Sequence, residues 1–109
     1  MPVLAEISVT PLGKEGASLG EAVVETLKVA EAEGVNYHVG PMGTSLEGDL
    51  ETLLRVMREM HEACFRKGYP RVITTIQIDD RRDKDLTMNY RVESVKRKLA
   101  EHATHLRES

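Results

Sequence analysis

Alternating apolar and polar residues open the chain and predict a half-buried β-strand over residues 3–10. Its apolar face consists of Val3, Ala5, Ile7 and Val9. Its other face is mixed and consists of Leu4, Glu6, Ser8 and Thr10. We expect the strand to end at Pro11 and Gly13, because proline donates no ladder hydrogen bond and glycine opens a turn.

A helix is predicted next, because apolar residues recur every three or four positions over residues 19–30. Ser18 and Glu21 have the spacing of a capping box, in which each side chain would bond a free backbone N–H of the first turn. Gly34 is the expected stop, since glycine readily takes the left-handed conformation that ends a helix.

A second helix is predicted between the N-cap Asp49 and Gly68. Its apolar stripe consists of Leu50, Leu53, Leu54, Met57, Met60, His61 and Cys64. His61 and Cys64 stand three positions apart and could share a metal ion, but their place in the stripe favours packing. His102 and His105 repeat this spacing near the end of the chain, where surface positions are expected, so no metal site is predicted.

The remaining elements are a hairpin, a strand and a last helix. Residues 35–39 and 44–47 predict the hairpin, with turn-forming residues at 40–43 between them. Residues 71–79 are rich in β-branched side chains and alternate like a strand, and the polar residues 80–85 predict a loop. The last helix is indicated by Val92, Val95, Leu99 and Ala103.

This β-α-β-β-α-β order predicts an α+β fold, a ferredoxin-like sandwich with an additional C-terminal helix, in one domain over residues 1–109. Two helices would cover one face of an antiparallel four-stranded sheet and leave the other face open. The open face would join the mixed side of the first strand to Ile73, Thr75, Gln77 and Asp79. Such a mixture favours a subunit interface with a polar pocket inside it, so we expect an oligomer.

Composition narrows the classes of function. The single cysteine permits no internal disulfide, and the first residues are not typical of a signal peptide, so a cytoplasmic location is expected. Tryptophan is absent and there is one phenylalanine, which disfavours nucleic-acid binding by stacking. No apolar run is long enough for a membrane span, and no nucleophile–base motif indicates an enzyme.

Charge is distributed unevenly along the chain. Residues 1–62 contain 11 acidic and 4 basic side chains, whereas residues 63–109 contain 7 acidic and 11 basic ones. We interpret this as two complementary surfaces within the fold or between subunits, with a phosphate-binding face as the alternative. Arg81, Arg82 and Lys84 could hold an anion, but Asp79, Asp80, Asp83 and Asp85 nearly cancel them, which favours a solvated loop.

The most informative polar cluster lies in the predicted hairpin arm. If Leu46 points toward the helices, Ser45 and Glu47 project onto the open face near Ser8, with Thr44 beside them. Hydroxyl groups and a carboxylate can recognise an amidine-like or an aminopyrimidine edge by paired hydrogen bonds. A solvated hairpin arm is the alternative.

Several segments resemble the small thiamine-binding, YkoF-like proteins of the UPF0045 (DUF77) type. They are residues 3–13, 37–43, 43–48 and 92–95, in the same order along the chain. The resemblance implies a ferredoxin-like fold, dimers of dimers, and non-catalytic binding of thiamine or its hydroxymethylpyrimidine part. We therefore expect a cytoplasmic homotetramer that needs no cofactor or metal and binds a thiamine-like pyrimidine between sheet faces.

Six residues are expected to contact this ligand: Ser8, Tyr37, Thr44, Ser45, Glu47 and Gln77. Glu47 is the expected principal recognition group, because a carboxylate can accept hydrogen bonds from the amino group and from a protonated ring nitrogen. The alternative hypothesis is a regulatory or interaction module whose open face serves only assembly.

Overall fold

The structure, a computed structural model, describes residues 2–84 and 87–108, with side chains as far as residue 104. Its elements are β1 (Val3–Leu12), α1 (Leu19–Glu33), β2 (Asn36–Val39), β3 (Thr44–Gly48), α2 (Leu50–Arg66), β4 (Arg71–Asp79) and α3 (Met88–Glu108). The four strands form one antiparallel sheet in the order β2-β3-β1-β4. The predicted ferredoxin-like α+β sandwich with an additional C-terminal helix is therefore confirmed.

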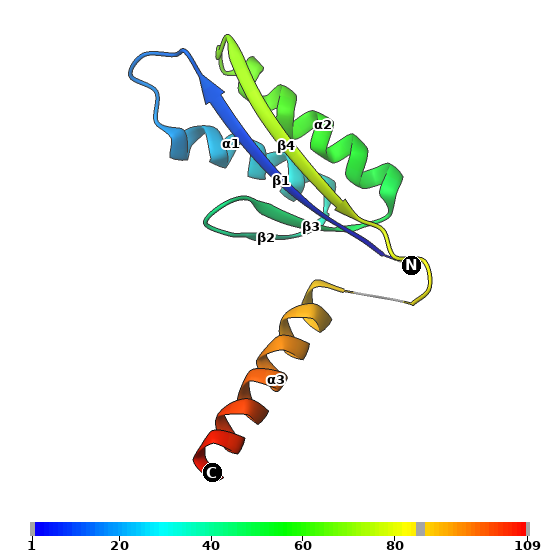
Figure 1. The fold of residues 1–109 in the computed structure, drawn as a ribbon. Helices are drawn as coiled ribbons and strands as arrows, with labels where there is room; N and C mark the ends of the chain where they lie inside the picture. The colour runs from blue at the N-terminus through cyan, green and yellow to red at the C-terminus, as the bar shows by residue number, and fades with distance from the viewer. Residues whose placement is uncertain (1, 85–86, 109) are drawn as a thin grey trace.

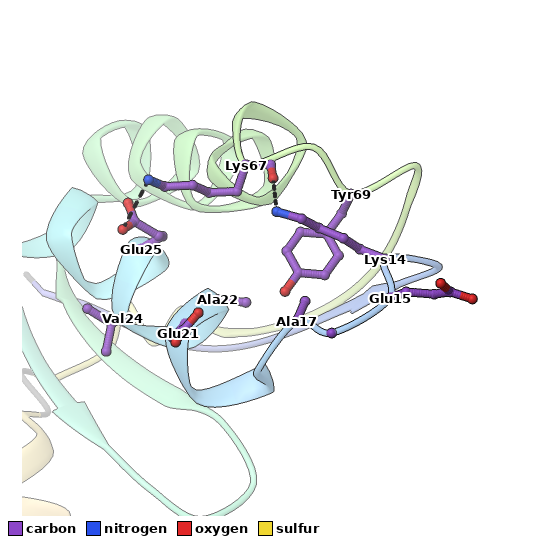
Figure 2. A pocket seen from close by; sticks show the side chains of 10 residues that line it. Lys14, Glu15, Ala17, Glu21, Ala22, Val24, Glu25, Lys67 and Tyr69 are labelled. Atoms are coloured by element: carbon purple, nitrogen blue, oxygen red, sulfur yellow. Dashed lines mark hydrogen bonds and ion pairs between the residues drawn. The ribbon is translucent and has the colours of Figure 1, made fainter.

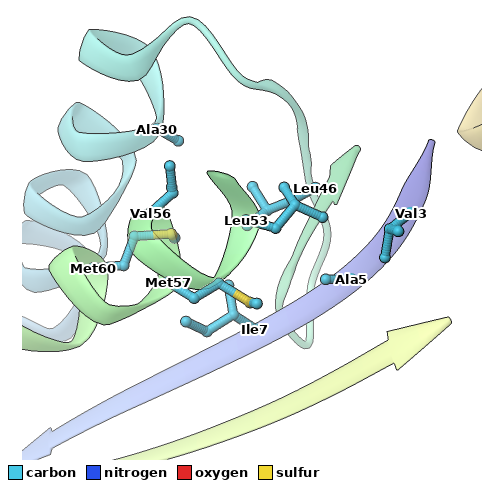
Figure 3. Close-up of a cluster of buried hydrophobic side chains, with 9 residues drawn as sticks. All are labelled: Val3, Ala5, Ile7, Ala30, Leu46, Leu53, Val56, Met57 and Met60. Carbon is cyan, nitrogen blue, oxygen red and sulfur yellow. The ribbon is translucent and has the colours of Figure 1, made fainter. Parts of the chain in front are cut away.

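The core lies between one face of the sheet and the two helices α1 and α2 (Figure 3). Its side chains are at most 5% exposed and belong to Val3, Ala5, Ile7, Ala30, Leu46, Leu53, Val56, Met57 and Met60. The odd-numbered residues of β1 supply the sheet side, as the alternation predicted. Leu46 is fully buried, so its neighbours on β3 point to the opposite face.

The strand β1 is longer than the sequence predicted, because it continues through Pro11 to Leu12. Its pairing with β3 ends at Ile7, whereas its pairing with β4 continues to the pair of Leu12 and Arg71. Beyond Ile7 the described strands flank β1 on one side only. A residue without a backbone N–H is tolerated there, since half of the backbone groups have no ladder partner.

The caps of α1 and α2 lie at the residues that the sequence predicted, but not all of the predicted capping hydrogen bonds form. Ser18 is the N-cap of α1, but its side chain makes no capping hydrogen bond, so the predicted capping box is wrong. Asp49 caps α2 as predicted, and its carboxylate accepts a 3.0 Å hydrogen bond from the Thr52 backbone N–H. Gly34 ends α1 with φ 68°, in the left-handed region that favours glycine.

The buried face of α2 differs slightly from the predicted stripe. Leu54 is 49% exposed and lies beside the stripe, while Val56 and Ala63 are buried in it. Cys64 is buried as predicted, and burial raises the pKa of its thiol. His61 is only half-buried and lies 2.6 Å from the Thr74 hydroxyl, from ring Nδ1 to Oγ1.

The helix α3 runs away from the sandwich and makes the molecule elongated, with extents of 57 × 32 × 20 Å (Figure 1). Its apolar stripe stays outside the core, since Val92, Val95 and Leu99 are each more than half exposed. Across the described parts of the chain, none of the helices is both long enough and apolar enough to cross a membrane.

Candidate functional site

Two rows of side chains, polar at every position except Leu4, cross the open face of the sheet. Strand register aligns His38, Ser45, Glu6 and Gln77 in the first row, running from β2 through β3 and β1 to β4. Directly opposed side chains on antiparallel strands lie about 5 Å apart. Four strands therefore bring four hydrogen-bonding groups together in one line.

The second row lies one pleat further along and consists of Asn36, Glu47, Leu4 and Asp79. This row holds the beginning of α3. The Met88 backbone N–H, at the first residue of the helix, donates a 2.8 Å hydrogen bond to Glu47 Oε2. Arg91 Nη1, one turn later, donates to Asp79 Oδ2 at 2.6 Å. A carboxylate at a helix N-terminus is also favoured by the helix dipole.

A cleft of about 1050 Å³ lies between the first row and the early turns of α3. His38, Ser45, Glu6 and Gln77 all line it from the sheet. From α3 it is lined by Met88, Asn89, Arg91, Val92, Glu93 and Lys96. The cleft is large enough for a drug-sized molecule and combines polar groups with apolar side chains, as small-molecule sites do.

The carboxylate of Glu6 stands out in this cleft. Glu6 is exposed and has no hydrogen bond or ion pair with any other described side chain or backbone group. The oxygens of Glu47 are already engaged, since Asn36 Nδ2 donates to Oε1 at 3.4 Å and the Met88 N–H donates to Oε2. Glu6 is therefore the better placed of the two carboxylates to accept hydrogen bonds from a bound molecule.

The six residues expected to bind a ligand are divided by the fold. Ser8, Ser45, Glu47 and Gln77 project onto the open face, whereas Tyr37 and Thr44 are paired with Leu46 and Ile7 on the helix-covered face. The Tyr37 hydroxyl donates to the Glu31 carboxylate, and this hydrogen bond raises the pKa of Tyr37. As ligand contacts, all six stay predictions.

A smaller pocket of about 170 Å³ brings Ser8 and Thr44 together beside the 40–43 turn. Ser45, Gln77 and Tyr37 line the large cleft instead. A third pocket, of about 400 Å³, lies on the helix side between α1 and the end of α2 (Figure 2). There the Lys14 ammonium donates to the Lys67 carbonyl and lies 5.2 Å from the centre of the Tyr69 ring.

Sequence reasoning did not select four residues of the cleft: Glu6, His38, Asp79 and Arg91. Alternation placed Glu6 and Asp79 on the open face, but only strand register shows which side chains oppose them. Arg91 could not be linked to the sheet from sequence, since its ion pair with Asp79 depends on where α3 begins.

The remaining candidates are less suited to binding. In the 80–84 loop, Arg81 pairs with Asp83 and Arg82 with Asp80, and these hydrogen bonds lower the pKa of both aspartates. The predicted role of Asp85, and the His105 side chain, lie outside what the structure describes. Within the described residues, no three His, Cys, Asp or Glu side chains are grouped so that they could hold a metal ion.

The fold and this cleft together define a small ferredoxin-like α+β domain with a polar cleft on its open sheet face. The sequence profile of the family described as "Thiamine-binding protein" matches residues 5–96, and the chain belongs to this family.

Relatives in bacteria and archaea support this membership. The chain is 42% identical over 100 residues to the UPF0045 protein YqgV of Bacillus subtilis, covering 88% of this chain and 96% of that relative. It is 41% identical over 98 residues to a UPF0045 protein of Methanothermobacter thermautotrophicus, covering 89% and 99%. Among solved structures, hypothetical protein MJ1052 of Methanocaldococcus jannaschii matches with a TM-score of 0.79 at 34% identity, covering 87% and 96%. The UPF0045 resemblance inferred from sequence is confirmed.

Proposed function

We propose that this protein binds thiamine, or the hydroxymethylpyrimidine part of thiamine, in the cleft between the open sheet face and α3. The observation that carries the proposal is the Glu6 carboxylate, which has no partner among the described residues and lies in line with Ser45, Gln77 and His38 on the cleft floor. Membership of the thiamine-binding family supports the choice of ligand. The role is binding without catalysis, in keeping with the family's description.

The chemistry of recognition follows from the side chains in the row. An aminopyrimidine presents an amino group beside a ring nitrogen, and the Glu6 carboxylate accepts from the amino group and from the nitrogen when it is protonated. Ser45 and Gln77, which flank Glu6, can each donate and accept. Glu47 has a different task in this proposal, because it holds the first turn of α3 that forms one wall of the cleft.

The proposal includes self-association to a dimer or tetramer. Ile73 on the open face is 46% exposed, and the apolar stripe of α3 is more exposed still. A second copy that covers these surfaces would also close the cleft from solvent, which strengthens hydrogen bonds inside it. The alternative is an interaction module in which the open face serves assembly alone.

Calorimetric titration of thiamine and hydroxymethylpyrimidine into matched variants tests the proposal. Glu6→Gln should weaken binding about ten- to a hundredfold, because charge-assisted hydrogen bonds contribute about 1.5–3 kcal/mol each. Glu62→Gln is the matched control, since Glu62 is exposed on α2, on the other side of the sheet. Full affinity in Glu6→Gln would remove Glu6 from the site, and a wild type that binds neither compound would favour the interaction module.

A further inference from the structure

The cleft has an excess of negative charge. Its described lining contains four carboxylates and two cationic groups. The carboxylates are those of Glu6, Asp79, Asp80 and Glu93, and the cations are Arg91 and Lys96. Asp80 is paired with Arg82 beside the cleft, so the excess is the charge of Glu6. A molecule that enters the cleft therefore meets a field that favours positive charge.

The two cations are not available to a bound anion without competition. Arg91 is held by Asp79 at 2.6 Å, and the Lys96 ammonium lies 3.8 Å from the Glu93 carboxylate. An anionic group would have to displace one of these carboxylates. It would also lie in the same cleft as the unpaired Glu6, and like charges at short range repel.

We propose that the cleft selects the positively charged, unphosphorylated ligand and rejects its phosphate esters. This inference rests on the proposed function, since it concerns the same cleft. Thiamine carries a permanent positive charge on its thiazolium ring, and Glu6 supplies the uncompensated negative charge that matches it. A phosphate ester adds about two negative charges near neutral pH and reverses the net charge of the molecule.

The test is a set of titrations with thiamine, thiamine monophosphate and thiamine diphosphate, at about pH 8, where the phosphate groups are fully ionised. The monophosphate should bind about tenfold more weakly than thiamine or worse, and the diphosphate more weakly again. Raising salt from about 0.05 to 0.3 M should weaken thiamine binding and reduce the difference in affinity between thiamine and its phosphate esters. The reason is that salt screens both the attraction of the cleft for thiamine and its repulsion of the phosphate groups. Glu6→Gln should also reduce this difference in affinity, whereas Glu62→Gln should leave the difference unchanged.

The outcomes separate this inference from the function on which it rests. Equal or tighter binding of the phosphate esters, with thiamine still bound, would overturn the charge selection and leave the binding function standing. A preference for thiamine that persists undiminished in Glu6→Gln and in high salt would also overturn it, since the preference would then arise from size. Absence of thiamine binding in the wild type would overturn the proposed function itself.

Discussion

At the scale of single residues, the position of Glu6 depends on a glycine of the neighbouring hairpin. A Cβ atom at Gly43 would lie 3.0 Å from the Ile7 carbonyl oxygen and 3.3 Å from Glu6 Cγ. The first of these neighbours is backbone of the central strand and cannot move without disturbing the sheet. Gly43 therefore allows the 40–43 turn and the Glu6 side chain to lie against each other.

Gly43→Ala should lower the free energy of unfolding by about 1–3 kcal/mol, because the added methyl group overpacks the junction of β1 and the hairpin. It should also weaken thiamine binding by displacing Glu6. Urea unfolding and calorimetry measure the two effects. Gly20→Ala is the control, since a Cβ there meets Ser18 Oγ at an ordinary 3.6 Å and alanine favours a helix. Unchanged stability and affinity in Gly43→Ala would contradict this account.

For Glu6 and Glu47, the sequence predicted the sheet face on which each side chain lies but not its hydrogen-bond partners. Alternation along one strand suffices to place Glu6 and Glu47 on the open face. Which of them is unpaired depends on Asn36 and Met88, which are 11 and 41 positions from Glu47. Contacts at such separations depend on strand register and on the start of α3, which local patterns do not determine.

At the scale of elements, α1 and α2 both begin at a residue that is typical of an N-cap, but only one of the two side chains makes a capping hydrogen bond. Ser18 and Asp49 are both N-caps with extended backbones, but only the Asp49 side chain bonds a backbone N–H of its helix. That hydrogen bond, from Thr52, lowers the pKa of the Asp49 carboxyl from its ordinary value of 3.8. The cap of α2 therefore depends on pH.

The sign of this dependence follows from linkage. Because the folded pKa of Asp49 is lowered, its contribution to stability is complete only well above the ordinary value of 3.8 and is lost as pH falls through the folded value. Asp49→Asn keeps a good N-cap but removes the titration. The urea midpoint of wild type should fall relative to that of Asp49→Asn as pH is lowered from about 6 to about 3. A constant difference across this range would show that the carboxylate charge is not involved.

The position of the helix α3 depends on its contacts with the sheet. Its spacing of apolar residues predicted the helix, whereas its exposed stripe and its two polar attachments could not be predicted, because they arise from contacts with β3 and β4. Glu47 provides one attachment and Asp79 the other. The helix is therefore a wall of the cleft that can be loosened without unfolding the sandwich.

Glu47→Ala should loosen that wall. Loss of a charge-assisted hydrogen bond to the Met88 N–H should reduce the local stability of the first turns of α3 by about 1–2 kcal/mol. Hydrogen exchange of residues 88–96 should become about tenfold faster or more, while that of β1 stays protected. Glu101→Ala, further along the same helix, is the control for effects on α3 alone. Equal exchange in Glu47→Ala and wild type would remove Glu47 as the anchor.

At the scale of the whole molecule, the uncovered apolar surfaces are the feature that a single chain leaves unexplained. Ile76 and Ile78 point to the helix side of β4 and are still 44% and 40% exposed, because β4 is an edge strand. On the other side, Ile73 and the stripe of α3 are exposed as well. Exposed apolar side chains that form a contiguous patch are typical of interfaces. The proposed assembly of copies of this chain would cover these side chains and the open side of the cleft.

Ile73→Asp should separate the assembly into monomers, because it would bury an unpaired charge at an interface, at a cost of several kcal/mol. Light scattering at micromolar concentration should give a dimer or tetramer for wild type and a lower mass for the variant. The fold should survive, since Ile73 lies on the open face and outside the core of the sandwich. Val24→Asp is the control, because Val24 is 51% exposed on α1, in the layer that covers the opposite face. If Val24→Asp separated the subunits and Ile73→Asp did not, the interface would lie on the helices, and the cleft would stay open to solvent in the assembly.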